Sequence, residues 1–516
     1  MSTTVFGNGR ILSMDARVGE PEVLVVTDGR IVAAGEHGLA TRYPHDERVD
    51  LGGRWLLPGF IDAHHHLCIA ALQPLWADLA GVDDVDEVGR RLREVADREP
   101  GTPWIRAYQW DGTPNGLHLD RWVLDELGLR RPVLVGCFSL HQAVVSSAGL
   151  DALGISRRTA DPRNGRIERD ESGEPTGRLV EGAWGAAHAA SMAGYDRARR
   201  WGDLIEVRAR TLLSYGITAV HDAACPVAAE EVYRQLASEH RLPVSVVVLP
   251  HAAEILNGAD PDRWFGPVTG EGDEDVRVGP VKFFADGGVE IAIDAHVGGH
   301  HVRFGQLFPD TAAGVAEAVA RGYGVAIHAM GNAGLAAALD AWEAATRHRE
   351  PDNGLRIEHV TLAGPGEVAR MQSLGVTGVV QPGFVELLGT QLGEARFDDA
   401  TWMPFGDLHA AGVPLAASSD APCNFTEPLA GTGYGVSRRT SGGDVVGMEQ
   451  SIPFEEWLRL YTYGAALAGG QQDERGRLLP GLRADLVVID GEPDAGRSVG
   501  VAQTWRAGEL VYERAG

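Results

Sequence analysis

The sequence predicts an α/β fold, namely a (β/α)8 TIM barrel with a composite β-sandwich domain from both termini and a large insertion after strand 1. Strand-like apolar runs alternate with helical patterns through the middle of the chain, and both ends contain only short strand-like runs. Alternating strands and helices favour parallel pairing, and eight such repeats favour a barrel. The eight runs are 56–66, 216–222, 242–249, 281–286, 324–328, 355–359, 376–381 and 413–420.

The domain organisation follows from the same patterns. The two ends are expected to pair in one sheet, because pairing would cover strand edges that neither end covers alone. Helical spacing lies between most of the central strands, as at 311–320 and 333–346. The insertion has its own strand at 132–138, and it is long enough to form a lid or side wall over the barrel mouth. The expected units are residues 1–57 plus 476–516 for the β-sandwich domain, 58–475 for the barrel, and about 67–210 for the insertion.

The composition narrows the classes of partner. The 516 residues are 44% hydrophobic and 23% charged, which is ordinary for a globular protein, and the formal net charge is −26. This acidity disfavours binding to nucleic acid or to an anionic membrane. The four cysteines lack CxxC spacing, and neither a signal peptide nor an apolar run of about 18 residues is found. We therefore expect a cytoplasmic protein with a small-molecule substrate, and a homo-oligomer remains open.

The first central strand ends in three consecutive histidines. The side-chain period of a strand is two, so His64 and His66 point to one face and His65 points away. Two imidazoles on the same face can bind one metal ion. The carboxyl end of a barrel strand is also where barrel enzymes carry their chemistry. The alternative is a histidine-rich turn without a function.

Four later strands also end in residues suited to a metal site. A barrel brings these strand ends into one ring. Imidazoles combined with oxygen donors favour Zn2+, one or two ions per chain, with Mn2+, Co2+ or Fe2+ as alternatives. A satisfied core histidine is the alternative for each later histidine taken alone. The residues are Lys282, His328, His359 and Asp420.

Lys282 is the only lysine among the 46 basic residues. An ammonium group is repelled by metal cations, but a neutral amine can react with CO2 to give a carbamate, an anionic ligand that can bridge two metals. Arginine cannot do this, because its guanidinium stays protonated. The alternative is a lysine whose stem packs in the protein and whose amine reaches solvent.

Asp420 follows the last strand in Ser418-Ser419-Asp420-Ala421-Pro422. A carboxylate beside a metal-bound water can ligate the metal, accept the proton of the water and later donate it to a leaving group. A metal lowers the pKa of its water from 15.7 to ~7 and polarises a carbonyl, so hydrolysis is the expected reaction class. The alternative for Asp420 is a helix N-cap.

These motifs resemble the amidohydrolase superfamily, and more narrowly the amidohydrolase-3 group with its YtcJ-like and N-substituted formamide deformylase-like proteins. The resemblance covers nearly the whole chain. The matching stretches are 58–66, 109–112, 173–177, 216–222, 281–287, 356–359, 419–422 and 481–488.

The resemblance implies hydrolysis of a C–N bond in an amide or formamide. It implies that His64 and His66 bind a first metal, that carboxylated Lys282 bridges two metals, and that Asp420 is the acid/base and a ligand of the first metal. By the same resemblance, His328 and His359 would bind the second metal. A deaminase or a cyclic amide or imide hydrolase on the same site is the alternative. A non-catalytic relative is disfavoured, because the full ligand set is present.

The chain departs from the family pattern at two places. The family often has Asp-Gly-His where this chain has Ser139-Leu140-His141-Gln142, so the histidine is kept. His141 is expected to be catalytic by contacting the substrate or its oxyanion, with a plain loop histidine as the alternative. Trp110 and Asp111 are expected to bind substrate, with packing of the tryptophan as the alternative. The second departure is the loop after Asp286, which contains His296, His300 and His301. We expect these histidines to be exposed to solvent, and the alternative is that they are accessory metal ligands.

Overall fold

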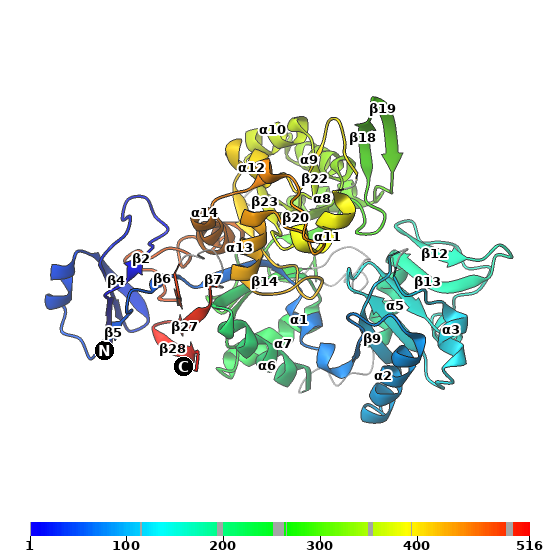
Figure 1. Cartoon of the computed structure of the whole chain (residues 1–516), viewed down its shortest axis with the longest axis horizontal. Helices are drawn as coiled ribbons and strands as arrows, with labels where there is room; N and C mark the ends of the chain where they lie inside the picture. The colour runs from blue at the N-terminus through cyan, green and yellow to red at the C-terminus, as the bar shows by residue number, and fades with distance from the viewer. Residues whose placement is uncertain are drawn as a thin grey trace.

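The computed structural model has three parts side by side (Figure 1): β-sheets formed by the two ends of the chain, a central α/β unit, and the insertion. The two termini lie close together on the side away from the insertion. The structure describes residues 2–113, 116–192, 200–250, 263–264, 266–348, 354–393, 395–491 and 499–515.

The central unit has two parallel sheets. All eight predicted strands are present in them, and one short strand that was not predicted, β16, joins the edge beside β15. The sheets also touch each other, because β7 contacts β25 and β15 contacts β17. The strands are β16 (Val276–Val278), β15 (Ser245–Pro250), β14 (Ile217–Cys225) and β7 (Phe60–His65) in one sheet, and β17 (Val281–Phe284), β20 (Val325–Ala329), β21 (Leu355–His359), β23 (Thr377–Val380) and β25 (Leu415–Ala417) in the other.

Helices pack on the outside of these strands, so the strands are buried on both faces, which explains their nearly continuous apolar runs. For example, α6 packs on β14, α7 on β15, α8 on β17 and α9 on β20. The helices of the central unit are α1 (Leu67–Ala70), α6 (Arg200–Ser214), α7 (Val227–Ser238), α8 (Thr311–Ala320), α9 (Asn332–Thr346), α10 (Pro365–Ser373), α11 (Phe384–Leu392), α12 (Phe405–Ala410), α13 (Pro428–Ser437), α14 (Phe454–Arg459), a π-helix (Leu460–Gly464), α15 (Ala465–Ala468) and the 3-10 turns Gln73–Leu75 and Met448–Gln450.

The two ends of the chain share one sheet of mixed direction, in which the N-terminal strand β6 pairs with the C-terminal strand β26. The run 504–512 forms a hairpin, because the backbone turns at Ala507 and Gly508, both with positive φ. A second sheet is entirely N-terminal. The shared sheet has β2 (Arg10–Ile11), β6 (Trp55–Pro58), β26 (Leu486–Ile489), β27 (Val501–Arg506) and β28 (Glu509–Glu513), and the second has β4 (Arg30–Gly35), β3 (Val23–Thr27), β1 (Thr3–Gly7) and β5 (Glu47–Asp50), with a 3-10 turn at His37–Thr41.

The insertion forms its own six-stranded sheet and a second hydrophobic core. The strand predicted at 132–138 is β10, in the middle of this sheet. In order, the strands are β12 (Gly165–Arg169), β13 (Pro175–Glu181), β11 (Gln142–Val145), β10 (Val133–Cys137), β9 (Ile105–Trp110) and β8 (Ala77–Asp78), with helices α2 (Val85–Arg98), α3 (Arg121–Glu126), α4 (Ser147–Ala152) and α5 (Gly182–Met192).

A β-hairpin after β17 projects outward from the central unit at the top of the view in Figure 1. It consists of β18 (Ile293–Val297) and β19 (His300–Phe304), and most of its residues are exposed. A small two-stranded sheet, β22 (Leu362–Ala363) with β24 (Thr401–Trp402), lies between α9 and α12 in the chain trace.

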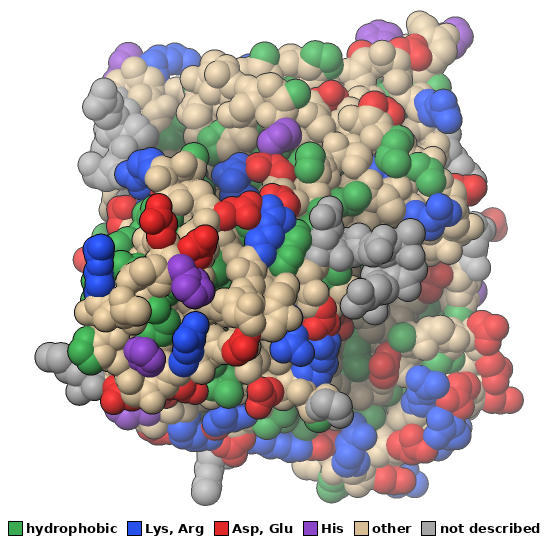
Figure 2. Space-filling view, turned by 60° about the vertical axis from the view of Figure 1, so that its left-hand side comes forward, with side chains coloured by type: hydrophobic (Ala, Val, Ile, Leu, Met, Phe, Trp, Pro, Cys, Tyr) green, Lys and Arg blue, Asp and Glu red, His purple; other side chains and the backbone are tan. Residues whose placement is uncertain are grey.

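Acidic and basic side chains alternate over the molecular face in Figure 2, and no large basic patch forms there. Among the described residues, no helix combines the length and apolar character that a membrane crossing requires.

Candidate metal centre

A cavity of about 440 Å³ lies at the carboxyl ends of the central strands. The predicted ligands come from five strands or the loops that follow them, and all of them line this one cavity. They are His64 and His66 from β7, Lys282 from β17, His328 from β20, His359 from β21, and Asp420 after β25.

Three of these residues form a compact cluster. Oδ1 of Asp420 lies 3.4 Å from Nε2 of His64 and 3.3 Å from Nε2 of His66. Each offers one ligand atom, and these three atoms lie within 4.8 Å of one another. The backbone N–H of Asp420 donates to the carbonyl of His64 at 2.8 Å, so the last strand is fixed against the first at this point. The cluster therefore has the dimensions of a metal site.

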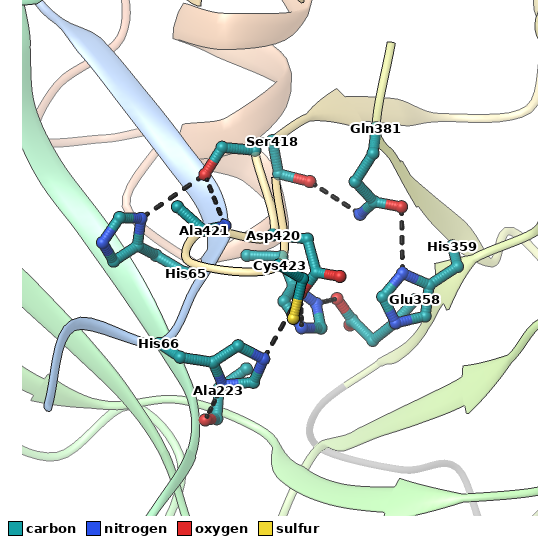
Figure 3. A network of polar contacts seen from close by, with 12 residues as sticks. His65, His66, Ala223, Glu358, His359, Gln381, Ser418, Asp420, Ala421 and Cys423 are labelled. Atoms are coloured by element: carbon teal, nitrogen blue, oxygen red, sulfur yellow. Dashed lines mark hydrogen bonds and ion pairs between the residues drawn. The ribbon is translucent and has the colours of Figure 1, made fainter. Parts of the chain in front are cut away.

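The ring orientations of three histidines are set by acceptors behind them (Figure 3). Nδ1 of His64 donates to Glu358 at 2.5 Å, Nδ1 of His66 to the carbonyl of Ala223 at 2.9 Å, and Nδ1 of His359 to Oε1 of Gln381 at 2.9 Å. Because each partner accepts, Nδ1 carries the proton. Nε2 of each ring is then left to bind a ligand in the cavity, as in metal-binding histidines.

His65 differs from its two neighbours. Its Nδ1 lies 3.0 Å from Oδ2 of Asp62, and Oγ of Ser419 donates to the same oxygen at 2.5 Å. His65 is fully buried and is not among the residues that line the cavity. It lies on the opposite face of the strand from His64 and His66, as the period of two predicts.

Two buried nitrogens in the cavity wall have no hydrogen-bond partner within the described part of the chain: Nζ of Lys282 and Nε2 of His328. Lys282 is 1% exposed, and its Nζ lies 4.9 Å from the ring centroid of Phe284. The ring of His328 lies 4.6 Å from that of His359. Unpaired buried nitrogens are rare in proteins and point to an ion or group that binds there.

Burial sets the charge state of these ligands. Burial lowers the pKa of Lys282 to about 8 and that of His359 to about 3. It also holds the pKa of His64 and of His328 well below the usual range. Burial alone would raise the pKa of Asp420, but its contacts with His66, His359 and Lys282 lower it. The site therefore favours neutral imidazoles and an ionised carboxylate, which are the forms that bind metals.

His141 lies on the opposite wall, which the insertion provides. It lines the cavity, and its ring lies 5.1 Å from that of His328. Its Nδ1 lies 2.6 Å from Oε2 of Glu181, a fully buried carboxylate at the end of β13. Burial would lower the pKa of His141, but Glu181 raises it above the usual value.

Other predicted residues lie elsewhere. Trp110 is 3% exposed, packs in the core of the insertion and donates through Nε1 to the carbonyl of Leu117. Asp111 is exposed. Neither is among the described residues that line the cavity. The three loop histidines lie on the β18–β19 hairpin, where His296 pairs with Asp399 and His301 with Asp294: His296, His300 and His301.

Sequence reasoning assigned no function to three buried residues behind the ligands. Glu358 accepts from His64, and Gln381 accepts from His359. Asp286 accepts three backbone N–H groups, which belong to Ala292 and to Met330 and Gly331 just after β20. Burial raises the pKa of Asp286 to about 7. Glu358 lies within the predicted strand 355–359, and Asp286 ends the predicted strand 281–286. A charged residue in a buried strand needs a buried partner, which is the signal that could have identified them.

Beyond the ligands, the cavity wall is mainly apolar. Arg178 is its one charged side chain outside the ligand set among the described lining residues, and it already donates to Oε1 of Gln142 and to the carbonyl of Gly112. The apolar side chains are Phe138, Leu140, Val289, Ile291, Phe284, Met330, Phe384, Leu387, Leu388 and Leu392.

Known proteins resemble this chain over its full length. It is 32% identical to N-substituted formamide deformylase of Arthrobacter pascens, over 99% of this chain and 98% of that protein. It is 27% identical to YtcJ of Bacillus subtilis (strain 168), over 99% of each. An uncharacterized metal-dependent hydrolase from Pyrococcus horikoshii OT3 has a similar fold, with a TM-score of 0.74, 24% identity, and coverage of 95% of this chain and 98% of the other.

The family model described as the Amidohydrolase family matches residues 47–512, which is most of the chain. This match and the strong similarity to the deformylase agree with the motifs at the strand ends. The chain belongs to the Amidohydrolase family.

Proposed function

We propose that this protein is a metal-dependent hydrolase that cleaves the C–N bond of a small amide or N-substituted formamide. The observation that carries the proposal is the convergence of four histidines, one lysine and one aspartate on a single cavity. Membership of the amidohydrolase family and the 32% identity to a formamide deformylase support the same reaction class.

The donor set fits one or two divalent ions, with Zn2+ favoured over Mn2+, Co2+ or Fe2+. We assign His64, His66 and Asp420 to the first ion, and His328 and His359 to the second. When bound, such ions supply an activated water at neutral pH and polarise a carbonyl. The buried nitrogens of Lys282 and His328 support this assignment, because neither makes a hydrogen bond within the described residues and a bound group would provide one.

Lys282 is proposed to carry a carbamate that bridges the two ions. The amine attacks CO2, a C–N bond forms, and one proton is released, which leaves an anionic carboxylate on Nζ. Burial favours the neutral amine that this reaction needs. The negative charges of nearby Glu358 and Asp420 act in the opposite direction and raise the pKa of Lys282. The carbamate would give the buried nitrogen of Lys282 the ligand role that an ammonium group cannot have.

Asp420 is proposed to move the proton. Its carboxylate is oriented between two histidines of the cluster. It would accept the proton of the attacking water and return it to the departing nitrogen, so that the amine leaves in neutral form. The apolar wall of Phe138, Phe284 and Phe384 would hold an uncharged apolar substituent on the amide, since no free charge faces it there.

For the overall architecture, we propose that the two parallel sheets form one closed barrel of residues 58–475. The contacts between β7 and β25 and between β15 and β17 support closure. We also propose that residues 1–57 and 476–516 form one composite β-sandwich domain, which the shared sheet of β6 and β26 supports.

The test is a substrate panel with protein loaded with Zn2+ and bicarbonate. We expect release of formate or another carboxylate together with an amine, and about two metal ions per chain by elemental analysis. Lys282→Arg should lower both the metal content and the rate. Release of ammonia from ring amines without an acid product would instead identify a deaminase. Unchanged metal content and rate in Lys282→Arg would disprove the carbamate bridge.

A further inference from the structure

The insertion contributes a buried pair of polar side chains to the cavity, His141 and Glu181. Oε2 of Glu181 accepts from Nδ1 of His141 at 2.6 Å. The backbone N–H of Gly288 lies 3.1 Å from the same nitrogen. The carboxylate is the closer contact and can only accept, so Nδ1 carries the proton, and no hydrogen bond to the other ring nitrogen, Nε2, is found among the residues that the structure describes. The ring lines the cavity, so this nitrogen is available to a substrate.

The second oxygen of Glu181 binds a different part of the molecule. Oε1 accepts the backbone N–H groups of Val289 at 2.9 Å and Glu290 at 3.3 Å. These residues belong to the loop after β17, the strand of Lys282, and Val289 itself lines the cavity. One carboxylate of the insertion thus holds both the ring of His141 and a wall of the central unit.

The same loop is shaped to fit this pair. A side chain at Gly287 would place its Cβ 2.2 Å from Oε1 of Glu181, and one at Gly288 would place its Cβ 2.4 Å from Cδ2 of His141. Real Cβ atoms do not approach so closely. Two consecutive glycines therefore let the loop backbone close against the carboxylate and the ring.

The backbone on the insertion side is strained at Glu181 and at the residue before His141. Leu140, next to His141, has φ of 57°, and Glu181 has φ of 52°. Residues other than glycine seldom adopt this region, and the strain persists only where surrounding contacts impose it. Strain at both residues indicates that the position of the pair is determined closely.

We propose that Glu181 is a positioning residue that holds His141 against the reacting amide and couples this contact to the loop 287–291. The inference rests on the proposed amide hydrolysis. His141 would touch the substrate, whereas Glu181 would act only through the ring and the loop. The insertion would then contribute to the reaction itself and not only cover the cavity.

The first test compares Glu181→Gln with Glu174→Gln, a matched change in the exposed turn before β13. The amide of glutamine can present a donor to Nδ1 of His141, so the ring loses its fixed orientation. We expect kcat to fall ~10–100-fold in Glu181→Gln, with KM changed less than about 3-fold and metal content unchanged. Glu174→Gln should behave as wild type. A kcat within about 2-fold of wild type in Glu181→Gln would overturn the proposal.

The second test is a double-mutant cycle with His141→Ala. If Glu181 acts through His141, adding Glu181→Gln to His141→Ala should lower kcat no further. Added imidazole should restore part of the activity of His141→Ala but less in the double variant. A further ~10-fold loss in the double variant would show that Glu181 acts on the loop alone and would overturn the positioning role.

A third variant changes the loop and leaves the side chains of His141 and Glu181 in place. Gly288→Ala should displace the ring and lower kcat, whereas Gly366→Ala, at a position with open space around its Cβ, should not. The activity of the wild type distinguishes failure of the proposed function from failure of the proposed role of Glu181. If the wild type releases no amine from any amide, the proposed function fails, and if it does but all three variants match it, only the role of Glu181 fails.

Discussion

Oε2 of Glu358 lies 2.5 Å from Nδ1 of His64, and both side chains are buried. Arg356 binds the same carboxylate, through Nε to Oε1 at 2.6 Å and through Nη2 to Oε2 at 3.0 Å. Within the described residues, each hydrogen bond of the Glu358 carboxylate is thus with a donor. A strand distant in sequence fixes the proton position on a histidine that we assign to the first metal.

Glu358→Gln should therefore weaken metal binding. A glutamine NH2 would face either Arg356 or His64, and each of them needs an acceptor. We expect affinity for the first metal to fall ~10–100-fold. Titration against a chelator of known affinity measures this change. The control is Glu367→Gln, which alters a helix cap on α10 and should keep wild-type affinity. Equal affinities in the two variants would disprove the role of Glu358.

His65 and His66 are adjacent but should respond in opposite ways. His66→Asn should remove the first metal and the activity, because His66 belongs to the cluster with His64 and Asp420. His65→Asn should keep the metal but lower the free energy of unfolding by about 1–3 kcal/mol, because Asp62 loses a buried partner. Elemental analysis and urea unfolding with chelator present measure these effects. Loss of metal in His65→Asn would contradict the assignment.

Loading of the carbamate should depend on pH. With a pKa of about 8, Lys282 is neutral in about a tenth of molecules at pH 7 and in about nine-tenths at pH 9. Carbamate formation needs the neutral amine, so raising the pH should accelerate it. The rate at which metal-free protein regains activity with Zn2+ should rise about tenfold between these values and then level off. Dissolved CO2 must be held constant, since its fraction of total carbonate falls with pH. A rate still rising steeply at pH 10 would indicate an ordinary lysine.

Arg475 connects the segment of the C-terminal strands to the central unit through buried contacts. It is 1% exposed, lies 3.2 Å from Asp485 through Nη1, and donates through Nη2 to the carbonyl of Glu274 at 2.7 Å. Arg475→Ala should lower the free energy of unfolding by about 3 kcal/mol, because it leaves a buried carboxylate with fewer partners. Arg459→Ala removes a solvent-accessible ion pair on α14 and should cost less than about 1 kcal/mol. Urea unfolding of both variants tests the difference, and similar losses would contradict it.

The sequence predicted the parts of the site that depend on local pattern. A strand that ends in histidine is visible in a short stretch, so the strands of His64, His328 and His359 could be placed from the chain alone. Their convergence followed from the expected parallel order. Asp420 was found in the same way, because it ends an apolar run, whereas Lys282 was found because it is the one lysine of the chain and lies on a hydrophobic strand.

The residues that hold these ligands in place could not be predicted, because their partners are distant in sequence. Glu358 is next to His359 but binds His64, and Glu181 binds both His141 and a loop after β17. Such pairings depend on register and loop path, which the sequence pattern does not define. The short strand β16 was also missed, because three residues are too few to show a period.

The strand β6 leads through Gly59 directly into β7, which carries His64. Its antiparallel partner is β26, near the other end of the chain, and the N–H of Gly59 donates to the carbonyl of Asp485. During synthesis, β6 leaves the ribosome early and has an exposed edge until almost the whole chain has followed. The segment that leads into the first two histidines therefore gains its C-terminal pairing partner only when almost the whole chain is present.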